Sequence, residues 1–152
     1  MTYWLMKTEP STFSLEDLAS RPNQTEPWDG VRNYQARNMM RDQMAVGDRV
    51  FFYHSNCAVP GIVAIAEIVR SGYPDPTAFD PDSHYFDPKS RPEQPTWYLV
   101  DVRLVRPLRR TIALSELKTV PELADFTLLR PGNRLSVMPV DPLHWQHILE
   151  RE

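Results

Sequence analysis

The segment from Gly61 to Val69 constrains the fold of this chain most strongly. It is almost continuously apolar and rich in β-branched residues, which is the pattern of a strand buried on both faces. A chain of 152 residues is long enough to bury such a strand in one well-formed core and too short for two comfortable domains. We therefore expect a single domain over residues 1–152, with this segment as a central strand.

Shorter patterns predict the elements around that strand. Aromatic or alternating segments bounded by turn residues indicate further strands at 3–7, 49–54, 97–108 and 135–140. Capping residues and apolar spacing predict short helices at 14–20, 34–44, 115–118 and 142–150. The 97–108 strand alternates between apolar and charged residues, so we expect it toward a sheet edge or on a half-exposed face.

The segment 71–95 differs from the rest of the chain. It is dense in proline and aspartate, with interspersed aromatic residues, and is predicted to be a long ordered excursion over the surface. The residues between 23 and 27 are predicted to be a turn-rich linker. Five or six strands interrupted by short helices indicate an α+β fold, in which a small, strongly bent sheet closes toward a barrel.

Composition excludes several classes of protein. The net charge of -3 argues against a protein that binds polyanions indiscriminately, although a local basic patch remains possible. Cys57 is the only cysteine, so neither an intrachain disulfide nor a cysteine-based zinc site can form. Fifteen prolines against five glycines indicate stiff loops, which suit a pocket with fixed walls.

Several sequence patterns that mark a cellular location or a catalytic site are absent from this chain. No run approaches the roughly 20 apolar residues of a membrane helix, and the first residues do not resemble a secretory signal, so we expect a cytoplasmic protein. There is no glycine-rich phosphate loop, nucleophile elbow or His-Glu-x-x-His helix. His144 and His147 are three residues apart but have no evident third ligand, so we expect no metal and no cofactor.

The stretch from Trp28 to Asn38 combines aromatic, amide and guanidinium side chains. Aromatic rings stack on nucleobases with about 1–3 kcal/mol per base, amides can hydrogen-bond to the base edge, and arginines near a helix N-terminus can hold phosphates. Tyr53, Ser55 and Asn56 end a predicted strand and can supply a second wall. The alternative is that Trp28 and Tyr34 are simply core residues.

Four motifs carry a resemblance to a known family. They are Lys7-Thr8-Glu9-Pro10, Trp28-x-Gly30-Val31-Arg32-Asn33-Tyr34-Gln35-Ala36-Arg37-Asn38, Tyr53-His54-Ser55-Asn56 and Leu135-Ser136-Val137-Met138-Pro139-Val140. In this order, and over nearly the whole chain, they resemble the EVE domain family. The resemblance implies a PUA-like pseudo-barrel of about five to six strands with short peripheral helices. It also implies a non-catalytic pocket for a modified base in DNA or RNA: 5-methylcytosine, 5-hydroxymethylcytosine or N6-methyladenine.

The resemblance also implies roles for individual residues. Trp28 and Tyr34 would contribute to an aromatic cage, and Asn33 would face the base edge. The opposite wall would be lined by Tyr53, His54, Ser55 and Asn56, and the backbone phosphates would be met by Lys7, Arg32 and Arg37. Two alternatives stay open: an enzyme acting on a modified nucleotide or base with His54 or Lys7 as acid-base group, and a protein-interaction module that uses the aromatic residues between Tyr73 and Phe86.

Overall fold

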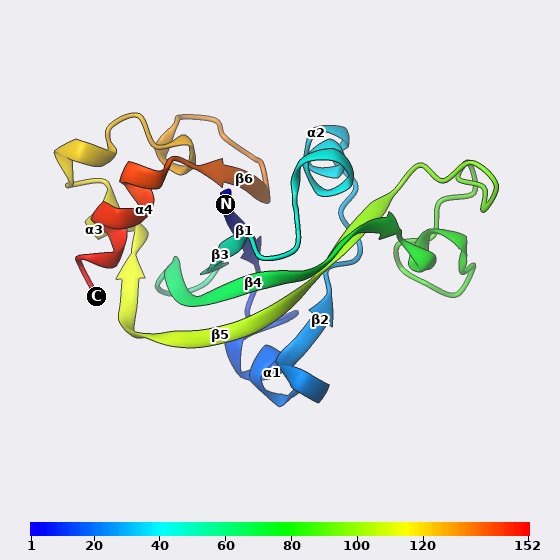
Figure 1. Ribbon diagram of the computed structural model, residues 1–152, viewed down its shortest axis with the longest axis horizontal. Coiled ribbons are helices and arrows are strands. Elements are labelled where there is room, and N and C mark those ends of the chain that lie inside the picture. The colour runs from blue at the N-terminus through cyan, green and yellow to red at the C-terminus, as the bar shows by residue number, and fades with distance from the viewer.

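The computed structural model describes residues 1–152 and contains one six-stranded sheet with short helices at its periphery (Figure 1). The strands follow the order β2-β5-β4-β3-β1-β6 across the sheet. Their bounds are β1 Tyr3–Thr8, β2 Thr25–Pro27, β3 Arg49–His54, β4 Gly61–Pro74, β5 Tyr98–Ala113 and β6 Val137–Val140. β1 runs parallel to β3, and every other pair is antiparallel. The expected α+β architecture with a mixed sheet is therefore confirmed.

The helical elements are short. The α-helices are α1 Leu15–Ser20, α2 Tyr34–Asn38, α3 Leu114–Leu117 and α4 Pro142–Leu149. Ser14 and Asp17 form a capping box at the start of α1, and the Asn33 side chain caps α2 by accepting from the Ala36 amide. α2 continues into one π-helical turn, η2 Met39–Gln43, and 3-10 turns lie at Pro22–Gln24, Pro76–Phe79, Pro121–Leu123 and Thr127–Leu129. None of the helices has the length and apolar character needed to cross a bilayer.

The sheet is buried on both of its faces. Trp4, Met6 and Phe52 belong to one cluster of buried residues, whereas Leu5 and Phe51 belong to the other. This division follows from strand geometry, since successive side chains point to opposite faces. β1 and β3 therefore hold the two halves of the core together, and residues next to each other in β3 face different surroundings.

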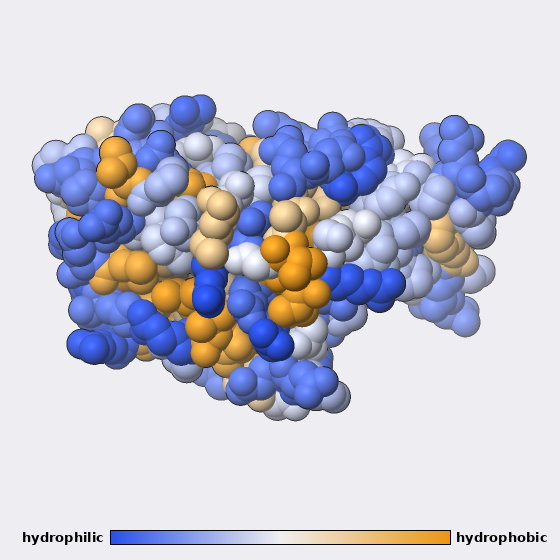
Figure 2. All heavy atoms as spheres, viewed as in Figure 1, coloured by the Kyte–Doolittle hydropathy of each residue, from blue (hydrophilic) through white to orange (hydrophobic).

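β4 and β5 form a long, bent hairpin that extends beyond the predicted strands. Register shifts in their pairing mark bulges, which bend a sheet and increase its twist. The excursion predicted at 71–95 begins later than expected, because β4 continues to Pro74. Residues 75–97, called the excursion from here on, project away from the body at the far ends of the two strands (Figure 1). Figure 2 shows that this projection is largely hydrophilic, while apolar patches over β4 and β5 are interrupted by hydrophilic side chains.

Two predictions about the sheet are corrected by the structure. Residues 25–27, expected to be linker, form β2 and pair with Asp101–Arg103 of β5. β5 itself alternates between buried and exposed residues, as expected for a half-exposed strand. Arg109 and Arg110 follow the predicted strand 97–108 in the sequence but lie within β5, which continues to Ala113. Cross-strand pairing supports these charged residues, which the local pattern alone does not place in a strand.

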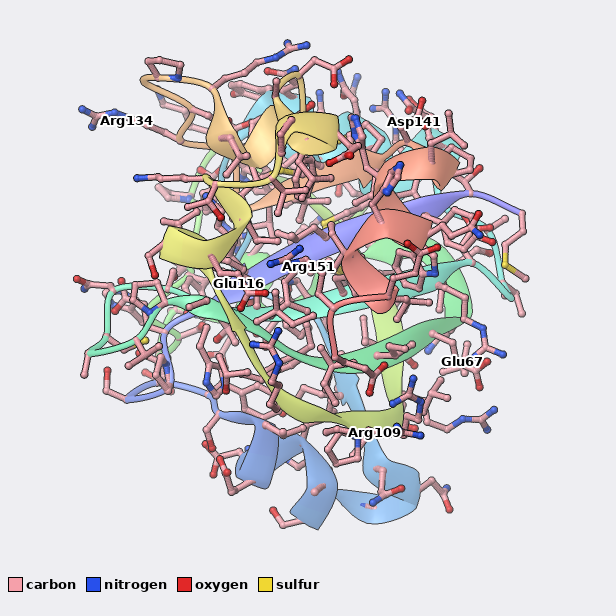
Figure 3. The ribbon with its side chains drawn as sticks, turned by 90° about the vertical axis from the view of Figure 1, so that its left-hand side faces the viewer. Glu67, Arg109, Glu116, Arg134, Asp141 and Arg151 are labelled. Atoms are coloured by element: carbon pink, nitrogen blue, oxygen red, sulfur yellow. The ribbon has the colours of Figure 1, made fainter.

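The arginines of β5 hold the C-terminal end of the chain. Arg106 pairs with Glu152, and Glu116 pairs with both Arg110 and Arg151, the last of which lies beside it in Figure 3. Hydrogen bonds from the guanidinium groups lower the pKa of both carboxyls to about 2. These exposed pairs fix the position of the terminal segment, although exposed ion pairs contribute little to stability.

Asp48 supplies a buried polar contact beside the core. Its carboxylate accepts hydrogen bonds from the Trp4 indole N–H at 3.0 Å, the Ala45 amide at 3.0 Å and the Thr2 amide at 3.1 Å. We predict that Asp48→Ala lowers the free energy of unfolding by about 3 kcal/mol, because it leaves buried donors without an acceptor. Urea denaturation measures this, with the exposed Asp42→Ala as a control expected to change stability by less than about 0.5 kcal/mol. Equal effects of the two variants would contradict the prediction.

Candidate nucleic-acid interface

A cleft of about 1300 Å³ opens at one end of the sheet. It is lined by the end of β1, the segments before and after α1, the segment 26–32, and parts of two further loops at 55–56 and 134–136. One residue of the excursion, Tyr85, also lines it. The volume exceeds that of a single base, and the lining mixes aromatic, charged and amide groups of the kind that bind nucleotides.

Trp28 is a mostly buried aromatic residue that lines the cleft. Its ring packs edge-on against Phe52, with centroids 5.7 Å apart, and against Phe13 at 6.4 Å. Trp28 is 8% exposed and lines the cleft, so most of the residue is core and a small part of it faces the cleft. Trp28 therefore contacts both the core and the cleft, the two positions that the sequence left open for it.

Lys7, Ser55 and Asn56 line the cleft on the side of β1 and β3. The Ser55 amide donates to the Thr8 carbonyl at 2.9 Å, which joins the ends of the two parallel strands. Asn56 has a φ of 52°, a conformation that asparagine tolerates better than most residues. Partial burial lowers the pKa of the Lys7 ammonium, and no carboxylate pairs with it.

Arg32 lines the cleft but its guanidinium is already occupied. It donates five hydrogen bonds, which go to the Asp75 carboxylate at 3.0 Å, the Thr77 hydroxyl, the Val31 carbonyl and twice to the Tyr85 carbonyl. An arginine has five N–H donors, so these five hydrogen bonds leave none free for a phosphate. The geometry therefore favours a structural role for Arg32 over the predicted phosphate contact.

Tyr34 and Arg37 lie outside the cleft. The Tyr34 ring is 61% exposed and stacks on Trp97 with centroids 4.9 Å apart. The Arg37 guanidinium lies 5.0 Å from the Tyr34 ring and donates to the Thr96 carbonyl at 2.7 Å. The structure thus does not bring Tyr34 together with Trp28 in one cage, because α2 carries Tyr34 toward the base of the excursion.

Three further predicted pocket residues serve other contacts. Tyr53 is buried in the second core cluster, on the face of β3 opposite Phe52 and Trp28, as strand alternation requires. It does not line the cleft, but its ring lies 5.9 Å from the ammonium of the cleft residue Lys7. His54 accepts a hydrogen bond at Nε2 from the Leu15 amide at 3.1 Å, and Asn33 is occupied as the N-cap of α2. Of the predicted site residues, the structure gathers Trp28, Lys7, Arg32, Ser55 and Asn56 in the cleft.

Most of the other residues that line this cleft were not among the predicted site residues, and two of them, Tyr85 and Arg134, carry side chains suited to contact a nucleotide. Tyr85 arrives from the excursion, far away in the chain, and no local pattern indicates its position. Arg134 lies in the loop before β6 and forms no ion pair; its side chain extends away from the ribbon in Figure 3. The dense basic and turn-forming sequence Arg130-Pro131-Gly132-Asn133-Arg134 was the available signal for this second residue.

Comparison with known proteins places the chain in a family. The sequence profile of the EVE domain matches residues 2–151. The chain belongs to the EVE domain family. Mouse thymocyte nuclear protein 1 is 45% identical over 167 residues, which cover 99% of this chain and 73% of that protein.

Comparison with solved structures agrees with this assignment. Human thymocyte nuclear protein 1, crystallised in complex with 5-methylcytosine containing DNA, is 41% identical and superposes with a TM-score of 0.93, covering 99% of this chain and 97% of that one. A Pseudomonas syringae protein is 49% identical with a TM-score of 0.92 and 98% coverage of both chains. The expected PUA-like α+β fold is thereby confirmed.

The relatives also correct one expectation. A cytoplasmic location was expected from the sequence, but the vertebrate members are nuclear proteins by name, and the human member was crystallised with DNA. These relatives therefore contradict the expectation of a purely cytoplasmic location. The patterns used for that expectation detect membrane and secretory segments, and they do not distinguish compartments inside the cell.

The contact between His54 and α1 generates a pH-dependence. Burial lowers the pKa of His54, partly offset by the nearby Glu16, while the unfolded chain titrates near 6.5. The unfolded state therefore binds more protons below about pH 6.5, so stability present above that pH is lost as the pH falls toward the folded pKa. Protonation also removes the acceptor for the Leu15 amide.

We predict that the free energy of unfolding of the wild-type chain decreases between pH 7.5 and pH 5.5. The decrease should be smaller in His54→Gln, whose amide does not titrate. Urea denaturation at the two pH values measures both. The same pH-dependence in the variant and the wild type would show that another group is responsible.

Proposed function

We infer that this EVE domain binds DNA carrying 5-methylcytosine and holds the modified base in the cleft beside Trp28. The observation that carries the proposal is the 41% identical human relative, which superposes with a TM-score of 0.93 and was crystallised in complex with 5-methylcytosine containing DNA. The proposed role is binding without catalysis.

The chemistry of the cleft supports the proposal. The exposed part of Trp28, together with Phe13, offers an apolar surface for a base and its methyl group. Ser55 and Asn56 offer a hydroxyl and an amide, groups that can donate to and accept from the edge of a cytosine. The apolar surface and the polar groups of the cleft are thus suited to bind a base that is flipped out of the duplex.

The two cations without ion pairs support a path for the DNA backbone. Lys7 and Arg134 both line the cleft, and neither has a carboxylate partner. Cleft carboxylates, such as Glu9 and Asp29, repel phosphates elsewhere along the lining. We propose that Lys7 and Arg134 contact the phosphates next to the bound base.

Base preference tests the proposal. We predict that the chain binds an oligonucleotide with one 5-methylcytosine at least about fourfold more tightly than the same oligonucleotide with cytosine, as expected for burial of one methyl group. Asn56→Gly should weaken binding of both by about fivefold through loss of a hydrogen bond, and glycine tolerates the φ of 52° at this position. Fluorescence anisotropy measures both effects.

Asn23→Gly is the matched control, since Asn23 also has a positive φ of 56° and lies outside the cleft. It should leave the affinity unchanged. The same assay compares 5-hydroxymethylcytosine, N6-methyladenine and RNA, which the sequence resemblance also implies. Equal and weak affinity for every oligonucleotide would contradict the proposal.

The phosphate contact of Lys7 has a separate signature. Lys7→Met keeps the apolar stem but removes the charge, so we predict weaker binding and a plot of log K against log salt concentration that is shallower by about one unit. Lys118→Met, an exposed lysine outside the cleft, makes the same change in net charge and should leave the slope unchanged. Identical slopes for Lys7→Met and the wild type would place the phosphates elsewhere.

A further inference from the structure

The excursion contacts the cleft through a single lining residue. Of residues 75–97, Tyr85 alone contributes to the lining, whereas its neighbour Phe86 is 39% exposed and lies outside the cleft. The rest of the excursion is tied together by its own contacts, including a 2.7 Å hydrogen bond from the Trp97 indole N–H to Asp87. An ordered loop of this length thus delivers one aromatic ring to the site.

The Tyr85 ring rests directly on the backbone of Gly30. A Cβ at Gly30 would lie 2.5 to 2.6 Å from three atoms at the hydroxyl end of that ring, which is closer than any real contact. Gly30 also has a φ of +79°, a conformation favourable for glycine. The residue therefore has two reasons to lack a side chain, and one of them is the close approach of Tyr85.

Arg32 and Asp75 hold the ring in that position. The Arg32 guanidinium donates to the Tyr85 carbonyl at 2.7 Å and lies 5.6 Å from the centre of the Tyr85 ring. Asp75 is fully buried and accepts from the Gly30 amide at 2.9 Å and from Arg32 at 3.0 Å. The same carboxylate thus ties the glycine, the arginine and the beginning of the excursion together.

We propose that Tyr85 is a base-contacting wall of the cleft, and that Arg32 is a positioning residue that holds it there. The inference rests on the proposed function. Tyr85 and Trp28 both line the cleft. The Tyr85 ring packs on Gly30, which is two residues from Trp28, so the Cα atoms of Trp28 and Gly30 lie within about 7 Å of each other. A base that contacts Trp28 then contacts Tyr85 as its second aromatic neighbour. This is the role expected from the sequence for Tyr34.

This arrangement defines the ligand more closely. A planar, unstacked pyrimidine presents a face that can pack on an aromatic ring, and a substituent at its 5-position extends in the plane of the base toward the cleft wall. The excursion then sets how much room that substituent has. Tyr85 should therefore affect the affinity for the modified base, while the Tyr34–Trp97 stack should not.

Substitution of Tyr85 tests the inference. We expect Tyr85→Ala to bind the 5-methylcytosine oligonucleotide about tenfold more weakly than the wild type, within the range for loss of one stacking contact. Tyr85→Phe keeps the ring and should stay within about twofold. Phe86→Ala removes an aromatic ring from the same loop outside the cleft and should leave the affinity unchanged. Melting temperatures verify that all variants are folded, and Gly30→Ala, which displaces the ring without removing it, should match Tyr85→Ala.

The outcomes separate the two proposals. If the wild type does not prefer 5-methylcytosine, both the proposed function and the role of Tyr85 fail. If the wild type prefers it and Asn56→Gly weakens binding, but Tyr85→Ala and Gly30→Ala bind as the wild type does, only the assignment of Tyr85 is overturned.

The positioning role of Arg32 has its own test in a double-mutant cycle. Arg32→Gln should weaken binding about as much as Tyr85→Ala does, leave the salt dependence unchanged, and have no further effect in the Tyr85→Ala background. Additive losses together with a shallower salt dependence would show that Arg32 contacts phosphate directly, and would overturn its role as a positioning residue.

Discussion

The buried carboxylate of Asp75 is the contact on which the cleft depends. It accepts hydrogen bonds from the Gly30 amide, the Arg32 guanidinium, and the amide and hydroxyl of Thr77. Burial alone would raise its pKa, but these hydrogen bonds outweigh that effect and hold the pKa below its ordinary value. A charge this deeply buried persists only when it is fully paired. The cleft segment with Gly30 and Arg32 and the beginning of the excursion with Asp75 and Thr77 therefore depend on each other for their conformation.

The sheet around this contact could be anticipated to a large extent from the sequence. The apolar run in β4 and the aromatic strands β1 and β3 lie where periodicity predicts them, because their burial makes the pattern strong. β2 was missed, since three residues carry no periodicity and its pairing with β5 is a tertiary contact. The ends of β4 and β5 were placed too early for the same reason: the hairpin partners stabilise polar residues that would otherwise favour a loop.

The candidate site was harder to predict than the fold. The sequence shows which types of residue the stretch from Trp28 to Asn38 contains, but the orientations of their side chains depend on geometry that a linear stretch does not show. Trp28 enters the cleft, whereas α2 turns Tyr34 and Arg37 toward Trp97, and alternation in β3 sends Tyr53 into the opposite core. Tyr85 is separated from Gly30 by a long excursion, so only the folded chain brings the two together.

A crystal structure of this EVE domain with an oligonucleotide that contains one 5-methylcytosine tests the central claim most directly. We predict that the modified base lies in the cleft, with Trp28 on one side, the ring of Tyr85 beside it, and Ser55 or Asn56 within hydrogen-bonding distance of its edge. A base stacked on the exposed Tyr34 ring, or DNA bound on a surface that leaves the cleft empty, would contradict the claim.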